Sequence, residues 1–499
     1  MVSSRSIEPQ IEYQKSNADW GMTFLLCGAY HLTATKLTSI AATGFMSDAH
    51  LYDTSAAENV TINDQSPDYK YASVFARMSI LLKQKYLASF NFRRDGSSRF
   101  GPSKQMGNFG SAAFAWLISN TRFFAEHLPF INFAKIRGGW GITGSDQIGD
   151  FKFVNSWSTT PGSYMGSTGF IPFQLAESSY SWELCRKLNI GIDLHFFKDR
   201  ISISIDAYQN RSRNLVLSDN LPGTTGFITI PARNSAAQVQ NKGLEFTLAA
   251  SVIRKKNFGW NSTLFFTTAS TVLYAFPGLQ ESRYARLYIV GESPTVQQGL
   301  HSQGVDPARG EFIFEDRNQD GIFKHPDDYI VFGDPDPKFH GGFENTITWK
   351  NLQVQFFFQG VAQKGYNILY WVYSSAMPGL AMKNQPLLVL DRWQHPGDIS
   401  RLQRFSTGEN AAAMEAAEKF AMSDRVFSDA SYLRLKNISI GFTIPASLLK
   451  KTRLTSCHIF INGQNLLTIT RYQAIDPETG SYNVLPPLKT WVAGCKISL

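Results

Sequence analysis

The sequence predicts an all-β fold, an antiparallel transmembrane β-barrel, and the first observation behind this is the length of its connections. Very short polar turns join strand-like segments into hairpins, namely Gln84-Lys85, Lys198-Asp199-Arg200 and Lys350-Asn351. The connections between hairpins run to tens of residues, as from Ser270 to Phe339. A barrel in an outer membrane is organised in this way, with short periplasmic turns and long extracellular loops.

The second observation is a period-two alternation of apolar and polar residues. In Ile201–Tyr208 every odd position is apolar, and the residues between them are Ser, Ser, Asp and Tyr. In Leu352–Gln359 one face carries Leu, Val and two Phe, while the other carries three Gln and one Phe. Such strands suit lipid on one side and a wet lumen on the other. No segment reaches the run of about eighteen apolar residues that predicts a membrane helix.

About fourteen strands follow from these signals, so the predicted barrel is incomplete. They begin near Trp20, Tyr71, Tyr86, Asn108, Phe133, Trp182, Ile201, Gln238, Phe258, Phe339, Leu352, Ser431, Thr455 and Lys489. Every short turn then lies on the periplasmic side and every long loop outside. Ser119–Pro129, the longest periplasmic connection, fits this rule least well. A helical pattern is confined to a loop segment, Glu409–Met422.

Composition excludes several classes of function. The formal charge of +8 comes from scattered Lys and Arg. No basic run alternates with aromatic residues, so we expect no nucleic-acid partner. A solvated surface is the favoured interpretation of the charge, ahead of contact with phosphate-rich lipopolysaccharide. The four Cys are far apart and are predicted to be isolated apolar residues. No HExxH pattern, nucleophile elbow or pair of acids indicates an enzyme.

The N-terminus lacks an export signal, because Met1–Gln14 has no apolar core behind a basic start. The chain is therefore expected to be either cytosolic or the C-terminal part of a longer protein. We expect residues 1–19 to be a stub that could form a remnant strand. Residues 20–499 are expected to be the C-terminal portion of the barrel.

One local motif predicts a metal site. Asp316, Asn318 and Asp320 occupy the first, third and fifth positions of a twelve-residue calcium loop, Gly321 the sixth and Asp327 the last. Ile322 would supply a backbone carbonyl, and Lys324 would leave its position to a water. The alternative is a solvated turn rich in Asp and Asn. A structural Ca²⁺ that stiffens an extracellular loop is favoured.

Two other motifs have structural interpretations. Arg93–Phe100 is a dense polar segment that could hold a phosphate or a sugar, but a salt-bridged loop that turns at Asp95-Gly96 is favoured. Gly138–Gly141 is glycine-rich but no helix follows it, so these glycines are expected to let a barrel strand bend.

Several longer segments resemble the SusC/RagA-type TonB-linked outer-membrane transporters (TonB-dependent receptors). They are RRDGSSRF at Arg93–Phe100, KIRGGWGITGSDQIG at Lys135–Gly149, NKGLE at Asn241–Glu245, GVDPARGEFIFEDRNQD at Gly304–Asp320, GDPDPKFHGG at Gly333–Gly342, SYLRLKNISIG at Ser431–Gly441 and INGQNLL at Ile461–Leu467. They occur in the order expected for the C-terminal part of that barrel. The resemblance runs from about Trp20 to the end of the chain.

The resemblance implies location in the outer membrane, surrounded by its lipid, and a complete barrel of roughly twenty-odd strands that imports glycan or peptide fragments. It also implies a SusD-type surface lipoprotein that closes the extracellular mouth, and a plug and TonB-contacting segment that couple transport to the inner-membrane proton gradient. The calcium-like loop of the family maps onto Asp316, Asn318, Asp320 and Asp327.

The chain departs from the family in showing no plug, TonB-contacting segment or first barrel strands, so we expect a truncated transporter. A second hypothesis is a calcium-stabilised surface β-protein that binds glycans as an adhesin. A third is a passive pore. The transporter hypothesis is favoured because a soluble protein could not expose a continuous apolar band that contains Ile203 and Val354.

Overall fold

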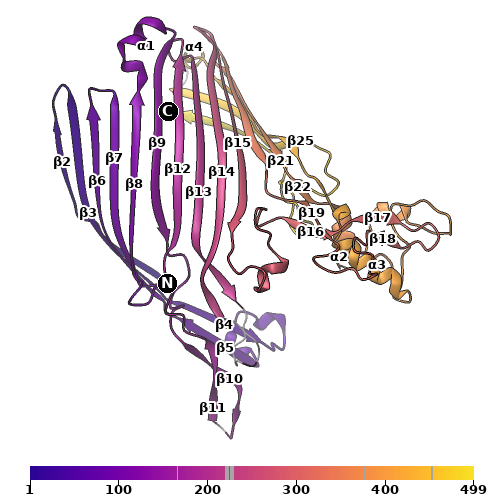
Figure 1. The fold of residues 1–499 in the computed structure, drawn as a ribbon. Coiled ribbons are helices and arrows are strands. Elements are labelled where there is room, and N and C mark those ends of the chain that lie inside the picture. The colour runs from indigo at the N-terminus through magenta and orange to yellow at the C-terminus, as the bar shows by residue number, and fades with distance from the viewer. Residues whose placement is uncertain (166, 220–223, 225–229, 376, 451–452, 499) are drawn as a thin grey trace.

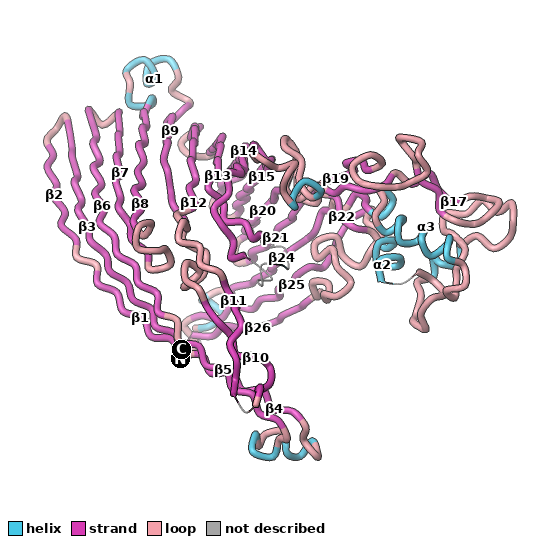
Figure 2. The backbone as a smooth tube through the Cα atoms, turned by 60° about the horizontal axis from the view of Figure 1, so that its bottom comes forward, coloured by secondary structure: helices cyan, strands magenta, loops and turns pink. Residues whose placement is uncertain are grey.

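The structure is a computed structural model that describes residues 1–499 except 166, 220–223, 225–229, 376, 451–452 and 499. Most of the chain forms one large, curved, antiparallel sheet (Figures 1 and 2). Its strands are β1 (Val2–Ile7), β2 (Gln10–Ser16), β3 (Trp20–Thr35), β6 (Asp68–Leu82), β7 (Tyr86–Ser97), β8 (Met106–Leu117), β9 (Ile131–Ser145), β12 (Glu183–Phe196), β13 (Ile201–Asp219), β14 (Ile230–Lys255), β15 (Phe258–Ala275), β20 (Phe339–Trp349), β21 (Leu352–Ala362), β24 (Tyr432–Thr443), β25 (Ser456–Thr470) and β26 (Thr490–Ser498).

Strands that follow one another in this series lie side by side, as expected for a barrel wall built from hairpins. β1 and β2 both pair with β3, β1 with its second half and β2 with its first half, and so share one place in the sheet. Among the described residues the sheet does not close, since β26 pairs only with β25 and β1 and β2 pair only with β3.

A strand lies at each of the fourteen predicted places, which confirms the predicted fold class. The largest difference is β14, which begins at Ile230 rather than near Gln238. Residues 231–237 of this strand are Pro, Ala, Arg, Asn, Ser, Ala and Ala, which show no alternation of apolar and polar residues, so no strand signal could be read there. Residues 1–19, expected to be a stub, contain β1 and β2.

The connections are sorted by length between the two ends of the sheet. The short turns lie at the upper end in Figure 1, together with α1 (Arg122–His127) and α4 (Ala446–Leu449). Lys83 and Gln84 have φ angles of 50° and 52°, and Lys198 one of 59°. Tight hairpins need this left-handed backbone to match the twist of their strands. Each side chain larger than Gly accepts it at a cost of about 1 kcal/mol.

The two faces of the sheet differ in polarity. Ile203 is a direct cross-strand neighbour of Leu194 and Leu248, and the same row continues across β15, β20 and β21 to Phe358. We call this side the apolar face and the opposite side the polar face. Large side chains exposed on the apolar face are Phe24, Leu26, Val74, Phe90, Phe92, Phe114, Ile136, Trp140, Leu188, Ile190, Leu244, Leu264, Phe343, Ile440, Phe442, Ile459 and Ile461.

No second sheet covers the apolar face in the described part of the chain (Figures 1 and 2). The large exposed apolar patch of a soluble protein rarely exceeds a few hundred Å². A band that crosses the whole sheet is therefore explained by contact with acyl chains, as the alternation predicts. None of the helices in the described ranges is long and apolar enough to span a membrane.

The long loops form three projections at the other end of the sheet (Figure 1). Two are hairpins, β4 (Leu37–Thr43) with β5 (Asn59–Gln65) and β10 (Ser156–Tyr164) with β11 (Ser167–Gln174). The third, which we call the lobe, is formed by residues 276–338, which precede β20, and residues 363–430, which follow β21. It contains β16 (Gln297–Leu300), β17 (Ser302–Val305), β18 (Phe312–Phe314), β19 (Tyr329–Gly333), β22 (Lys364–Tyr366), β23 (Phe427–Asp429), α2 (Ile368–Ser375) and α3 (Ala411–Ala421).

The lobe has a core of its own. Phe420 of α3 is 2% exposed and stacks on Phe312 with ring centroids 3.7 Å apart. Tyr373 of α2 meets Phe420 edge-on at 5.0 Å. The helix predicted at Glu409–Met422 is confirmed as α3, whose first turn is capped by the Asn410 side chain accepting from the amide of Ala413.

Two local expectations were wrong. Asp95 and Gly96 do not form a turn but lie inside β7, paired with Ser73 and Ala72. The predicted ion pairing is present, since Arg93 Nε lies 2.6 Å from Asp95 Oδ1. The cysteines are also not all isolated, because the free thiols of Cys457 and Cys495 lie 3.4 Å apart across β25 and β26.

Candidate transport path

A charged cluster occupies the polar face where β9, β12 and β13 are neighbours. Arg137 Nε lies 3.0 Å from Asp193 Oδ2, and Arg137 Nη1 lies 2.5 Å from Asp206 Oδ1. Lys135 Nζ is 3.4 Å from the same Asp193 carboxylate. Gly191 lies between these groups, where an added Cβ would come within 2.6 Å of Asp206 Oδ1. The cluster therefore needs a strand position without a side chain.

A hollow of about 630 Å³ in the sheet lies beside this cluster. Its wall includes Gln14 of β2, Ser79 of β6, Ser89 of β7 and Arg137 of β9. The register places these four side chains on the polar face. Because hydroxyl, amide and guanidinium groups bind water and polar solutes, this face can line an aqueous path.

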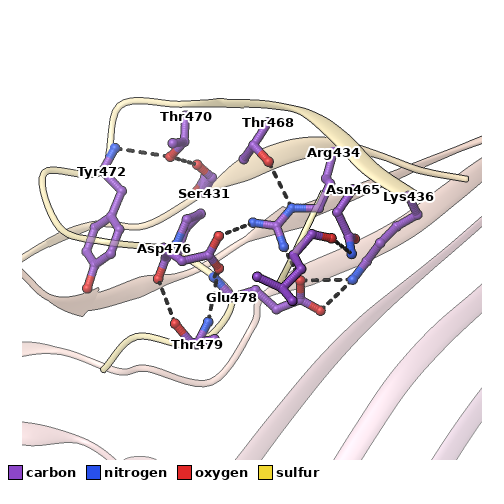
Figure 3. Close-up of polar contacts among 12 residues, drawn as sticks. Ser431, Arg434, Lys436, Asn465, Thr468, Thr470, Tyr472, Asp476, Glu478 and Thr479 are labelled. Carbon is purple, nitrogen blue, oxygen red and sulfur yellow. Dashed lines mark hydrogen bonds and ion pairs between the residues drawn. The ribbon is translucent and has the colours of Figure 1, made fainter. Parts of the chain in front are cut away.

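Arg434 of β24 lies at the outer end of the polar face. Its side chain is only 1% exposed, and its Nη2 and Nη1 atoms each lie 2.5 Å from a carboxylate, those of Asp476 and Glu478 (Figure 3). Arg434 Nε also donates to the Thr468 hydroxyl at 3.0 Å, and Lys436 Nζ lies 2.7 Å from Glu478. A buried guanidinium needs such partners, since an unpaired buried charge is strongly unfavourable.

Arg434 and its partners hold the connection between β25 and β26, residues 471–489, against the wall. The same connection reaches the base of the lobe, where Gln363 Nε2 donates to the Pro477 carbonyl at 2.6 Å. The Tyr472 hydroxyl donates to the carbonyl of Tyr366 in β22, which pairs with β23. One network thus joins the wall, the outer connection and the lobe.

The lobe carries a cavity of about 850 Å³ that combines aromatic and charged groups. It is lined in part by Arg286, Tyr288, His325 and Tyr329. His325 Nε2 lies 3.3 Å from Gln298 Oε1. Burial, and next the charge of Arg286, hold the pKa of His325 below its ordinary value, so the imidazole is neutral at pH 7. Such a wall can stack against rings and donate hydrogen bonds.

In the predicted calcium loop, side-chain carboxylates accept hydrogen bonds from backbone amides of the same loop. Asp316 accepts from the amides of Gln319 at 2.7 Å and Gly321 at 2.8 Å. Gly321 has a φ of +74°, as the sharp turn requires. Asp320 Oδ1 accepts from the amide of Ile322 at 2.7 Å. That amide, and then Lys324 and Asn318, hold the pKa of Asp320 below its ordinary value.

The ammonium group of Lys324 lies between two carboxylates of this loop. Its Nζ lies 3.2 Å from Asp320 and 3.6 Å from Asp327. The buried carboxylate of the loop is the following residue, Asp328, which accepts from the amides of Arg317 at 2.9 Å and Lys324 at 3.0 Å. No group of three or more acidic, His or Cys side chains converges as a metal site in the described residues. The ammonium group must move before a metal could bind between these carboxylates.

The sequence did not single out the Arg137 and Arg434 clusters. Each arginine does follow the alternation that places it on the polar face. The partners of Arg434 could not be read from the sequence, because Asp476 and Glu478 lie more than forty residues after it in the chain. A polar residue at an inward strand position was the only available signal.

Comparison with known proteins gives a consistent result. The family described as TonB dependent receptor-like, beta-barrel matches residues 8–466. TonB-dependent receptor P3 of Formosa agariphila is 26% identical over 507 residues, which cover 95% of this chain and 49% of that protein. TonB-dependent receptor SusC of Bacteroides thetaiotaomicron is 25% identical over 461 residues, 85% of this chain and 43% of that protein.

Solved structures show the same fold. A structure of the RagAB peptide transporter superposes with a TM-score of 0.84 at 21% identity and covers 99% of this chain and 55% of that one. The RagAB peptide importer in its 'open-open' state gives a TM-score of 0.82 at 19% identity, with 100% and 55% covered. The chain spans about half the length of the curated relatives that it matches.

Proposed function

Since this chain belongs to the TonB dependent receptor-like β-barrel family, we propose that it lines the path by which glycan or peptide fragments are imported across the outer membrane. The family locates the chain in the outer membrane. Its members are transporters and not enzymes, in agreement with the absence of catalytic motifs from the sequence.

The difference between the two faces of the sheet carries this proposal. One face exposes a continuous row of Ile, Leu and Phe, and the other carries the ion pairs of Arg137 and Arg434. A transporter needs both surfaces, one toward acyl chains and one toward water. The adhesin hypothesis explains the loops but leaves the apolar face without a partner.

The substrate class rests on the resemblance to SusC and on the similarity to a RagAB peptide transporter. Deletion of the gene should abolish uptake of the fluorescent oligosaccharide or oligopeptide that the wild-type strain takes up. Arg286→Gln, which removes a cation from the wall of the lobe cavity, should reduce uptake of that same substrate while membrane levels of the protein stay unchanged. Unchanged uptake of every oligosaccharide and oligopeptide in the deletion strain would contradict the proposal.

Two partners follow from the same proposal. A SusD-type surface lipoprotein would cover the extracellular mouth, with the lobe as part of its contact surface. TonB would act through a plug and a TonB-contacting segment of the kind that the family carries, with residues 20–499 as the C-terminal part of the barrel. Affinity purification of the tagged chain from outer membranes should recover the lipoprotein. If the chain without the lobe recovers as much lipoprotein as the complete chain, the lipoprotein contacts another part of the barrel.

A structural Ca²⁺ in the loop Asp316–Asp327 is the last part of the proposal. Asp316, Asn318, Asp320, the Ile322 carbonyl and Asp327 would ligate it once Lys324 swings into solvent. Lys324→Asp removes the competing cation and adds an oxygen ligand at the ninth position, so it should tighten binding at least about tenfold. Calorimetry on the purified protein would measure this. No calcium uptake by either protein would exclude the site.

A further inference from the structure

Four cations gather on the apolar face of β12, β13 and β14, toward their extracellular side. They are Arg186, Arg211, Arg213 and Lys242. The unbroken register between these strands places all four on the side that carries Ile190 and Ile205. Where the register of these strands is unbroken, from Arg213 to the periplasmic turn in β13 and over the residues paired with it, none of the outward positions is Asp or Glu, and no ion pair of the four is present among the described residues. Their charge is therefore uncompensated by the protein.

Two of these cations lie directly opposite each other. Arg186 and Arg211 are cross-strand partners in the β12–β13 ladder. Like charges at such positions are separated by only about 5 Å at Cβ and destabilise a sheet. A chain can tolerate this pair where an anion lies between the two guanidinium groups.

Arg211 is held in place by two neighbours and still has one N–H donor without a hydrogen-bond partner. Its Nη2 donates to Gln240 Oε1 at 2.7 Å, and its guanidinium lies 3.7 Å from the centre of the Tyr274 ring. The Nε atoms of Arg211 and Arg213 are both buried without a hydrogen-bond partner. A buried guanidinium donor without a partner costs free energy until an acceptor reaches the site.

The height of the cluster matches the outer surface of the membrane. Arg211 follows Ile201, which is next to the periplasmic turn, by ten residues. At about 3.3 Å per residue and a tilt of about 40°, Arg211 lies about 25 Å above Ile201. This is about the full height of the apolar band of an outer-membrane barrel. Trp140, 52% exposed, shares the cross-strand row of Leu188 just below, as interfacial tryptophans do.

An apolar groove of about 480 Å³ lies directly beneath the cations. The outward side chains of its wall come from β12 to β15 and are mostly apolar or small, with Lys242 included. They are Leu188, Ile190, Ala207, Gln209, Lys242, Leu244, Thr268 and Ser270. A positive cluster above an apolar groove is complementary to a molecule that carries both phosphate and acyl chains.

We propose that this surface is a binding site for a phosphorylated, acylated glycolipid of the outer leaflet, a molecule of the lipid A type. Its phosphate is held between the guanidinium groups of Arg186 and Arg211, and an acyl chain lies in the groove beside Ala207 and Leu244. The bound phosphate neutralises the Arg186–Arg211 pair. The site anchors the barrel at a fixed height and is separate from the transport path, which lies on the polar face.

The test is binding of bisphosphorylated lipid A to the full protein, purified from outer membranes in detergent. The double variant Arg186→Gln, Arg211→Gln should bind lipid A at least about tenfold more weakly, because two charge-assisted contacts are lost. The matched control is Lys187→Gln, which removes an exposed charge from the same strand but on the polar face, and its affinity should not change. Lipid A without phosphate should bind the wild type as weakly as bisphosphorylated lipid A binds the double variant.

Arg186→Gln alone tests the same surface without touching a buried group, and it should weaken binding measurably even where the double variant folds poorly. Equal affinity of wild type and Arg186→Gln for lipid A would overturn the proposal. So would equal binding of the lipid with and without phosphate. A shift from dimer to monomer in the variant, with lipid binding unchanged, would assign the surface to a second copy of the chain instead.

Discussion

Replacing Arg434 by methionine should release the connection between β25 and β26 from the barrel wall. The Arg434 side chain is 1% exposed and Asp476 11%, whereas Glu478 is 32% exposed and keeps Lys436 as a partner. Removing one member of a buried ion pair costs about 3–5 kcal/mol. The lower value applies here because, of the two carboxylates, Asp476 alone is left without a cationic partner among the described residues. About 3 kcal/mol corresponds to a roughly hundredfold increase in the open population of the connection.

Hydrogen exchange measured by mass spectrometry would detect this change. Amides of residues 471–489, such as that of Gly480, which donates to the Asp476 carbonyl at 3.0 Å, should exchange about a hundredfold faster in Arg434→Met. Lys436→Met is the control and should change exchange little, since it leaves both ion pairs of Arg434 intact. The double variant Arg434→Met, Asp476→Leu should recover part of the protection, because no unpaired charge remains. Unchanged exchange in Arg434→Met would refute this account of how the connection is held.

Two further substitutions test the lobe core and the apolar face. Phe420→Ala leaves a cavity against Phe312 and should destabilise the lobe by about 3–5 kcal/mol. The loss should be seen as proteolytic cleavage within residues 276–338 or 363–430 while the barrel strands stay intact. A protease-resistant lobe would contradict the packing. Ile205→Lys, nearer the middle of the apolar band, should lower barrel stability by about 2–4 kcal/mol in an unfolding titration in lipid vesicles, and Ser204→Lys on the polar face should cost far less. Equal losses of stability from the two Lys substitutions would show that the two faces contact the same surroundings.

The strand pattern of the wall was readable from sequence because each strand has one apolar face. The period-two positions of Ile203 and Val354 gave both the strands and their orientation. The short turns gave the pairing of hairpins, and with it the order of the sheet. The start of β14 at Ile230 was missed because the hairpin there rises beyond the membrane, where no apolar face is required.

The loop structure was much less predictable. The sequence predicted α3 but not α2, whose residues are nearly all apolar and lack amphipathic alternation. Asp95-Gly96 looked like a turn because that dipeptide often forms one, but β7 continues through it and its Arg93–Asp95 ion pair lies along the strand. The partners of Arg434 depend on how residues 471–489 fold back, which no local pattern reports.

The central claim is that the apolar face contacts acyl chains while the polar face contacts water. It is tested most directly by spin labels placed singly at each position from 201 to 208 in a cysteine-free protein reconstituted in lipid. Collision with oxygen, which concentrates in lipid, should peak at the odd positions, and collision with a water-soluble nickel chelate should peak at the even ones. Equal accessibility at neighbouring positions, or the opposite phase, would contradict the claim.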